Sequence, residues 1–234
     1  HFNKLFEVTK ILGWCNENTK LNHLGFGLIL SKNGGKFRTR SGDTIHLIDL
    51  LNEAKYRSKK ILQERVTLGK CQLSETEIEE TSTKIGYGSV KYYDLRLGTT
   101  KNYTFDYDDV LNFNGNTAIY LQYTYTRIRA IIRKSGVNMS SINQPLELIE
   151  PKEIELGMLL VRYQEIILSA INSLSPSTLC GYLYKIVSKF NEFYNSCRVN
   201  GHEKMHSRLQ LCHVTTLVIS KFLYLLGINT VEKL

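Results

Sequence analysis

The chain has 234 residues, of which 42% are hydrophobic and 3 are proline, enough to build one large domain or two small ones. A net charge of +8 favours an anionic partner without specifying one. The most apolar stretch, 214–228, contains Lys221 and is shorter than the roughly 20 residues that cross a bilayer, which excludes a membrane span and argues against a membrane partner. Five dispersed cysteines with no Cys-x-x-Cys pair argue against a disulfide scaffold and predict a reducing, cytoplasmic compartment.

The N-terminal part has the pattern of an α/β sheet edge. Apolar residues at helical spacing over 2–12 predict a short helix, and the apolar run 24–30 predicts a strand. A basic, glycine-containing loop at 31–42 follows, and helical spacing resumes over 47–62. Because glycines let a backbone approach a ligand closely, the loop is a candidate polyphosphate site; an exposed basic turn is the alternative.

The remainder of the chain reads as helices. Ser74 starts a Ser-x-x-Glu capping box, which predicts a short exposed helix at 75–83, and Gly86 and Gly88 are expected to interrupt the chain before the next element. Beyond Gly115 we expect helices at 117–135, 156–174, 176–195 and 207–226, with Gly136 and Gly227 as stops. The fold class is therefore mainly α, with a C-terminal helical bundle of about four or five helices.

One segment matches a metal-binding pattern. Residues 202–206 read His-Glu-x-x-His, which on a helix can hold zinc. Here Asn200-Gly201 precedes the segment, a new helix is expected from Ser207, and no third ligand follows at the required spacing. Cys197 and Cys212 flank the segment without the spacing of a structural zinc site. We therefore predict no metal site.

The helix expected at 117–135 carries aromatic and basic residues together. Tyr120, Tyr123 and Arg127 share one face at i, i+3 and i+7, and a neighbouring face carries Gln122, Arg129 and Arg133. Aromatic rings can stack on unpaired bases while the cations hold phosphates, which is what binding an RNA loop requires. The alternative from spacing alone is that the tyrosines fill the bundle core and the arginines are solvated.

Three motifs, in order, resemble those of arginyl-tRNA synthetases. Gly115-Asn116-Thr117-Ala118-Ile119-Tyr120-Leu121-Gln122-Tyr123, followed by Arg127, resembles their G-N-T-A-x-Y-x-Q-Y-x-x-x-R signature. Lys36-Phe37-Arg38-Thr39-Arg40-Ser41-Gly42-Asp43-Thr44 and Gly86-Tyr87-Gly88-Ser89-Val90-Lys91-Tyr92 are similar to two motifs of the eukaryotic-type enzymes. Further similarity to the C-terminal portion includes Lys189-Phe190-Asn191 with Phe193-Tyr194. The resemblance spans essentially the whole chain.

The resemblance implies a domain organisation. Residues 1–46 would be the tail end of an α/β Rossmann-type class I catalytic domain with a KMSKS-like loop, 47–110 a helical stem-contact region, and 111–234 the anticodon-binding helical bundle. No His-x-Gly-His signature is present in the chain, so the arginine and adenine pockets are expected upstream.

The resemblance also implies site residues. The ATP loop would comprise Gly35, Lys36, Phe37, Arg38, Thr39, Arg40, Ser41 and Gly42, with Lys36, Arg38 and Arg40 as the catalytic cations. Thr39 stands where the second lysine of a KMSKS loop usually lies, so another cation must replace it. The tRNA-binding set would be Tyr120, Gln122, Tyr123, Arg127, Arg129, Arg133 and the C-terminal Leu234, which is expected to pack near the anticodon bases.

The activity that the resemblance implies is ATP-dependent activation of L-arginine with Mg²⁺, followed by transfer to tRNA-Arg. We expect this segment to hold no tightly bound metal and to be inactive alone, because the half that carries the His-x-Gly-His motif is missing. The alternative from another class is a non-catalytic tRNA-binding or protein-docking helical module. In that case the 35–42 loop would have no catalytic role.

Overall fold

The computed structural model describes residues 1–30, 46–142 and 144–234. At the N-terminus, α1 (Phe2–Ile11) is joined by an extended segment to β1 (Ile29–Leu30), which pairs in parallel with β2 (Tyr103–Thr104). The expected helix at 2–12 is confirmed, whereas the strand expected at 24–30 is reduced to its last two residues. Only these two align with β2; Phe26 remains 86% exposed because no described strand covers it.

Two long helices form an antiparallel hairpin, α2 (Leu47–Thr67) and α3 (Glu75–Leu95). The capping box at Ser74 is confirmed, but the short helix expected at 75–83 is wrong, since α3 continues through Gly86 and Gly88. A Cβ at Gly86 would lie 2.6 Å from the backbone nitrogen of Lys55, so this glycine lets the two helices approach closely. Gly86, which was expected to interrupt the chain, therefore serves the packing of α3 against α2.

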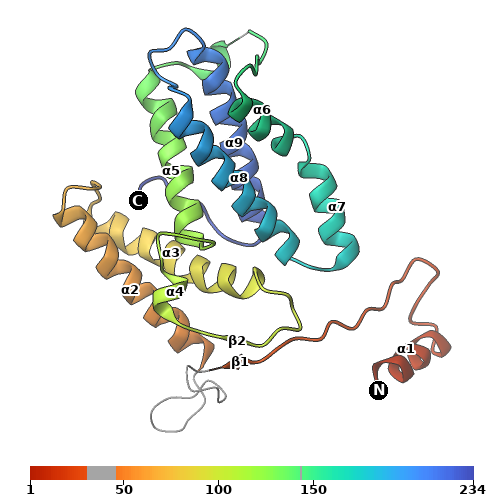
Figure 1. The fold of residues 1–234 in the computed structure, drawn as a ribbon. Helices are drawn as coiled ribbons and strands as arrows, with labels where there is room; N and C mark the ends of the chain where they lie inside the picture. The colour runs from red at the N-terminus through yellow and green to blue at the C-terminus, as the bar shows by residue number, and fades with distance from the viewer. Residues whose placement is uncertain (31–45, 143) are drawn as a thin grey trace.

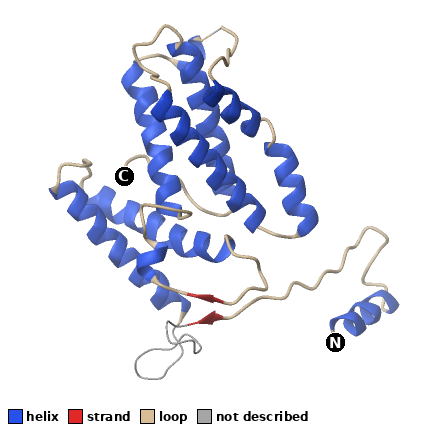
Figure 2. Ribbon diagram, viewed as in Figure 1, coloured by secondary structure: helices blue, strands red, loops and turns tan. Residues whose placement is uncertain are grey.

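The C-terminal bundle follows the short helix α4 (Tyr107–Val110). It contains α5 (Ala118–Ser135), a 3₁₀ turn at Met139–Ser141, α6 (Pro151–Leu160), α7 (Tyr163–Ser173), α8 (Ser177–Ser196) and α9 (Met205–Leu225), as Figure 1 and Figure 2 show. Gly136 and Gly227 stop α5 and α9 with φ of 67° and 66°, as expected. The chain is thus mainly α, as predicted. No helix within the described ranges is long and apolar enough to cross a membrane.

The single helix expected at 156–174 is wrong, because the structure divides it into α6 and α7. The Tyr182 hydroxyl donates to the Leu159 carbonyl at 2.7 Å. In a continuous helix that carbonyl would accept from the N–H of Tyr163. It instead accepts from Tyr182 and, at 3.2 Å, from the N–H of Arg162, so the chain turns at this point.

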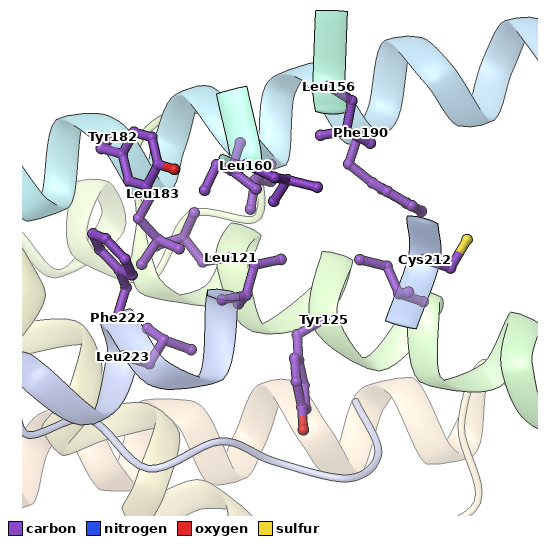
Figure 3. Close-up of a cluster of buried hydrophobic side chains, with 14 of the residues drawn as sticks. Leu121, Tyr125, Leu156, Leu160, Tyr182, Leu183, Phe190, Cys212, Phe222 and Leu223 are labelled. Carbon is purple, nitrogen blue, oxygen red and sulfur yellow. The ribbon is translucent and has the colours of Figure 1, made fainter. Parts of the chain in front are cut away.

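Two apolar cores meet at α5. The larger core lies between α5, α6, α8 and α9 and includes Leu121, Leu156 and Phe222, each fully buried (Figure 3). The smaller core packs α2, α3 and the C-terminal segment against Ile119 on α5. Since Ile119 and Leu121 point into different cores, α5 is the element that joins the hairpin to the bundle.

Candidate nucleic-acid interface

The first turn of α5 is fixed by the residues of the Gly-Asn-Thr motif. Thr117 caps the helix by accepting from the N–H of Tyr120 at 3.2 Å, and its hydroxyl donates to the Asn112 carbonyl at 2.6 Å. The side-chain oxygen of Asn116 accepts from the buried Tyr92 hydroxyl at 2.6 Å. Asn116 and Thr117 therefore orient α5, and the motif residues that follow them belong to the candidate interface.

A row of alternating rings and guanidinium groups lies at the junction of the hairpin and the bundle, and we call it the Arg–aromatic row. The Arg65 guanidinium carbon lies 4.9 Å from the ring centre of Phe113 and 5.5 Å from that of Tyr123. The Arg127 guanidinium lies 5.0 Å from the Tyr123 ring and 5.6 Å from the Tyr194 ring. The five residues come from α2, the loop before α5, α5 itself and α8. Rings and cations held together in this way match the needs of an unpaired RNA loop.

Tyr120 and Tyr123 lie with Arg127 on one face of α5, and both rings are half-buried. The Tyr120 hydroxyl accepts from the Asn191 side-chain amide at 2.8 Å, and the Tyr120 ring lies 6.1 Å from that of Tyr184. The Arg127 guanidinium donates to the Tyr123 hydroxyl at 3.3 Å. Each tyrosine therefore packs one edge against the protein and leaves part of its ring accessible, which combines the two alternatives left open by the sequence.

The structure corrects the expected placement of Gln122, which is only 1% exposed. Its amide nitrogen donates to the Asn229 carbonyl at 2.6 Å, and its amide oxygen accepts from the N–H of Val231 at 3.2 Å. Both ends of the side chain are thus bonded to the C-terminal segment. Gln122 fastens that segment to α5 and does not lie on the accessible face.

The C-terminal segment also accounts for the other basic residues predicted on α5. Arg129 and Arg133 lie 3.5 and 3.9 Å from the Glu232 carboxylate, with exposed fractions of 42% and 53%. Leu234 is 8% exposed within the smaller core, and its main-chain oxygen accepts from Arg65 at 3.4 Å. The last residue therefore lies against the Arg–aromatic row, while Arg129 and Arg133 are partly neutralised by Glu232.

Replacing Gln122 by leucine is expected to lower the free energy of unfolding by about 2 kcal/mol, because the Asn229 carbonyl and the Val231 N–H lose buried partners. Hydrogen exchange at the Val231 amide should accelerate in this variant. The matched control is Gln164→Leu on α7, where an exposed glutamine donates to the hydroxyl of the adjacent Tyr163. Equal exchange at Val231 in wild type and Gln122→Leu would contradict the fastening role.

The predicted ATP loop, residues 35–42, lies outside the described residues, so its cations Lys36, Arg38 and Arg40 remain expectations from the sequence. The His-Glu-x-x-His segment, residues 202–206, lies within the described residues. Helix α9 begins at Met205, which leaves His202 in the preceding turn, where its ring nitrogen accepts from the N–H of Lys204 at 3.1 Å. His202 and His206 thus do not share a helix, and the described residues contain no group of three potential metal ligands.

Three members of the Arg–aromatic row were not identified from the sequence as site residues. Tyr194 belongs to the Lys189–Tyr194 segment that resembles the family, and Phe113 lies two residues before Gly115, so each carried a weak signal. Arg65 carried none, because a basic residue near the end of an exposed helix is common. Arg65 lies beside Phe113 and Tyr123 only because the α2–α3 hairpin packs against α5, and no local sequence pattern predicts this packing.

Two family models match the chain in sequence order. The catalytic domain of class I (R) tRNA synthetases matches residues 1–107, and the DALR anticodon binding domain matches residues 121–234. Together the two matches define a segment of a class I aminoacyl-tRNA synthetase, in which catalytic-domain sequence is followed by an anticodon-binding domain.

Similar proteins narrow this class. The chloroplastic/mitochondrial and cytoplasmic arginine–tRNA ligases of Arabidopsis thaliana are 44% and 40% identical over the whole chain, which spans 37% and 40% of their lengths. The crystal structure of the Plasmodium falciparum arginyl-tRNA synthetase matches 100% of the chain and 39% of its own, with a TM-score of 0.86 and 32% identity. The chain belongs to the arginyl-tRNA synthetase family. It spans about two fifths of the length of these relatives.

Proposed function

We propose that the chain acts as the anticodon-recognising part of an arginine–tRNA ligase and also supplies the ATP loop of that enzyme. The observation that carries the RNA-binding part is the Arg–aromatic row, in which Tyr123 and Arg127 of the family signature lie between Arg65 and Tyr194. Two half-buried rings beside cations can stack on unpaired bases and hold the adjoining phosphates. The tRNA partner proposed is tRNA-Arg, in keeping with the names of the relatives.

Within the described residues, Arg127 has no carboxylate within ion-pair distance, whereas Arg65 donates at 3.4 Å to the main-chain oxygen of Leu234, the last residue of the given sequence. The positive charge of Arg127 is therefore available to phosphate, unlike those of Arg129 and Arg133, which share Glu232. Binding should therefore weaken as salt increases, because each phosphate contact releases condensed counterions. We keep Tyr120, Tyr123, Arg127, Arg129, Arg133 and Leu234 as proposed contacts and assign Gln122 a positioning role.

The catalytic part of the proposal rests on sequence similarity. The 35–42 loop retains the family pattern within the match to the class I catalytic domain. Lys36, Arg38 and Arg40 would stabilise charge developing on the ATP phosphates while L-arginine is activated. We propose ATP and Mg²⁺ as requirements of the complete enzyme and assign Mg²⁺ no ligand in this chain. The boundaries 1–46, 47–110 and 111–234 remain our proposed division.

A cytoplasmic site of action remains part of the proposal. One of the Arabidopsis relatives is the cytoplasmic enzyme, at 40% identity, and the other is the chloroplastic/mitochondrial enzyme, at 44%. Fractionation with an antibody against the bundle would test the location directly. Signal in the cytosolic fraction supports it, and signal confined to an organelle contradicts it.

The test of the proposed function compares two proteins, this chain alone and the product of its complete coding sequence. Both should bind tRNA-Arg more tightly than a non-cognate tRNA, and only the complete product should charge tRNA-Arg with radiolabelled arginine in the presence of ATP. A complete product that binds tRNA-Arg without charging it would favour the non-catalytic module. Equal binding to both tRNAs would contradict anticodon recognition.

A further inference from the structure

The chain segment after α9 brings one carboxylate to α5. The Oε2 atom of Glu232 lies 3.5 Å from a guanidinium nitrogen of Arg129 and 3.9 Å from one of Arg133. Within the described residues, no other carboxylate lies within ion-pair distance of either arginine. Both arginines are proposed RNA contacts. A carboxylate oxygen shared by two guanidinium groups occupies the place that a phosphate oxygen would take if both arginines bound RNA.

The backbone is fixed on both sides of Glu232, whereas its side chain is free to move. Val231 is 1% exposed, and its N–H donates to the Gln122 side chain at 3.2 Å. Leu234 lies within the smaller core. The Glu232 side chain is 64% exposed by contrast, and exposed side chains change rotamer within nanoseconds. The carboxylate can therefore leave the arginines while the segment stays in place.

The contacts of Glu232 are also weak enough to be exchanged. The buried pair Arg208 and Glu153 meets at 2.6 Å, whereas Glu232 reaches its two arginines at longer distances and in contact with solvent. Exposed ion pairs contribute little to stability. A phosphate group can accept two parallel hydrogen bonds from a guanidinium, which is a stronger contact than Glu232 makes. The structural alternative is that Glu232 only offsets the repulsion between like charges four residues apart on α5.

We propose that Glu232 competes with RNA for Arg129 and Arg133. Its carboxylate pairs with both arginines in the RNA-free chain, and a backbone phosphate displaces it when RNA binds. The inference rests on the proposed function, because the two arginines are contacts of the same RNA. The carboxylate lowers the affinity of the bundle for any polyanion that uses these arginines, including RNAs without the arginine anticodon.

The experiment measures binding of the whole chain to a fluorescent anticodon stem-loop of tRNA-Arg at about 0.15 M salt, where charges farther apart than roughly 8 Å are largely screened. Glu232→Gln is expected to tighten binding about two- to fivefold, the range set by exposed ion pairs. A stem-loop with a non-cognate anticodon should gain equally, since phosphate contacts carry no sequence information.

The matched control is Glu165→Gln, which removes the same charge from another exposed ion pair. Glu165 pairs with Arg162 at 2.7 Å at the start of α7, on the opposite side of the bundle from α5 (Figure 1). Its loss should leave RNA affinity unchanged. A gain in Glu165→Gln as large as that in Glu232→Gln would overturn the inference, because net charge alone would then explain both.

A second comparison separates competition from direct repulsion of RNA by Glu232. Glu232→Gln is added to the double variant Arg129→Met/Arg133→Met, where it should change affinity by less than about 1.5-fold, since contacts made through a shared partner are not additive. A gain as large as that in the wild-type background would overturn the inference. So would unchanged or weaker binding in Glu232→Gln alone, the result expected if Glu232 only supports the segment.

Thermal unfolding checks that each variant is folded. Glu232→Gln should melt with the wild type, because exposed ion pairs contribute little. If the double arginine variant does not fold, Arg133→Met alone replaces it, and the gain from Glu232→Gln should then be smaller than in the wild-type background. A wild-type chain that binds both stem-loops equally would contradict the proposed function itself. Cognate preference without a gain from Glu232→Gln would contradict this inference alone.

Discussion

Replacing Arg208 by methionine is expected to lower the free energy of unfolding by about 3–5 kcal/mol, the typical cost of leaving one member of a buried ion pair unpaired. The side chains of Arg208 and Glu153 are 5% and 1% exposed, and they meet at 2.6 Å between α9 and α6. Arg208 also donates to the Arg198 carbonyl at 2.6 Å. Urea denaturation of the two proteins measures the difference.

The double variant Glu153→Leu/Arg208→Met is the control, because it removes both charges and should recover most of the lost stability. If Arg208→Met alone changed the free energy of unfolding by less than about 1 kcal/mol, the ion pair would not hold α6 and α9 together. A double variant as unstable as the single one would show that packing volume, and not the uncompensated charge, is what matters.

The same pair predicts a pH dependence. Burial would raise the pKa of Glu153, but the N–H groups of Ile149 and Glu150 and the Arg208 guanidinium outweigh burial and hold the pKa below its usual value. The carboxylate therefore contributes stability above its unfolded pKa of about 4.3 and loses it as the pH falls through the lower folded pKa. The defect of Arg208→Met should shrink over this acidic range, because the unpaired carboxylate becomes protonated.

Tyr123→Ala is expected to weaken binding of the tRNA-Arg anticodon stem-loop by about 5- to 150-fold, the range that corresponds to losing roughly 1–3 kcal/mol of stacking on one base. The substitution also removes the ring that lies beside both Arg65 and Arg127. Fluorescence anisotropy at fixed salt measures the affinity.

Tyr224→Ala is the matched control, because Tyr224 is a 72% exposed tyrosine on α9 and is not part of the Arg–aromatic row. Its loss should leave RNA affinity unchanged. Unaltered affinity in Tyr123→Ala, with a normal thermal transition, would mean that Tyr123 is a packing residue and that the RNA binds elsewhere.

Local signals in the sequence predicted the ends of several helices correctly. Ser74, Gly136 and Gly227 act through hydrogen bonds or backbone angles within a few residues, and each has the expected role. The division between α6 and α7 was not predictable in this way. It depends on the hydroxyl of Tyr182, which lies 23 residues from the carbonyl it contacts.

The site shows the same division between local and long-range information. The shared face of Tyr120, Tyr123 and Arg127 follows from helical periodicity and is present in the structure. The burial of Gln122 depends on the C-terminal segment, 107 residues away, and the position of Arg65 depends on how the hairpin packs against α5. Long-range packing therefore buries Gln122, which the motif predicted to be accessible, and places Arg65, which belongs to no motif, beside the Tyr123 ring.

Anticodon reading by this chain is tested most directly with two RNA stem-loops that differ only in the anticodon bases. We expect the arginine anticodon to bind at least about tenfold more tightly, a difference of roughly 1.4 kcal/mol, and Tyr123→Ala to lower the affinity of that stem-loop most. Equal affinity for the two stem-loops would contradict the account. The Arg–aromatic row would then bind RNA without regard to sequence, and recognition would have to lie outside this chain.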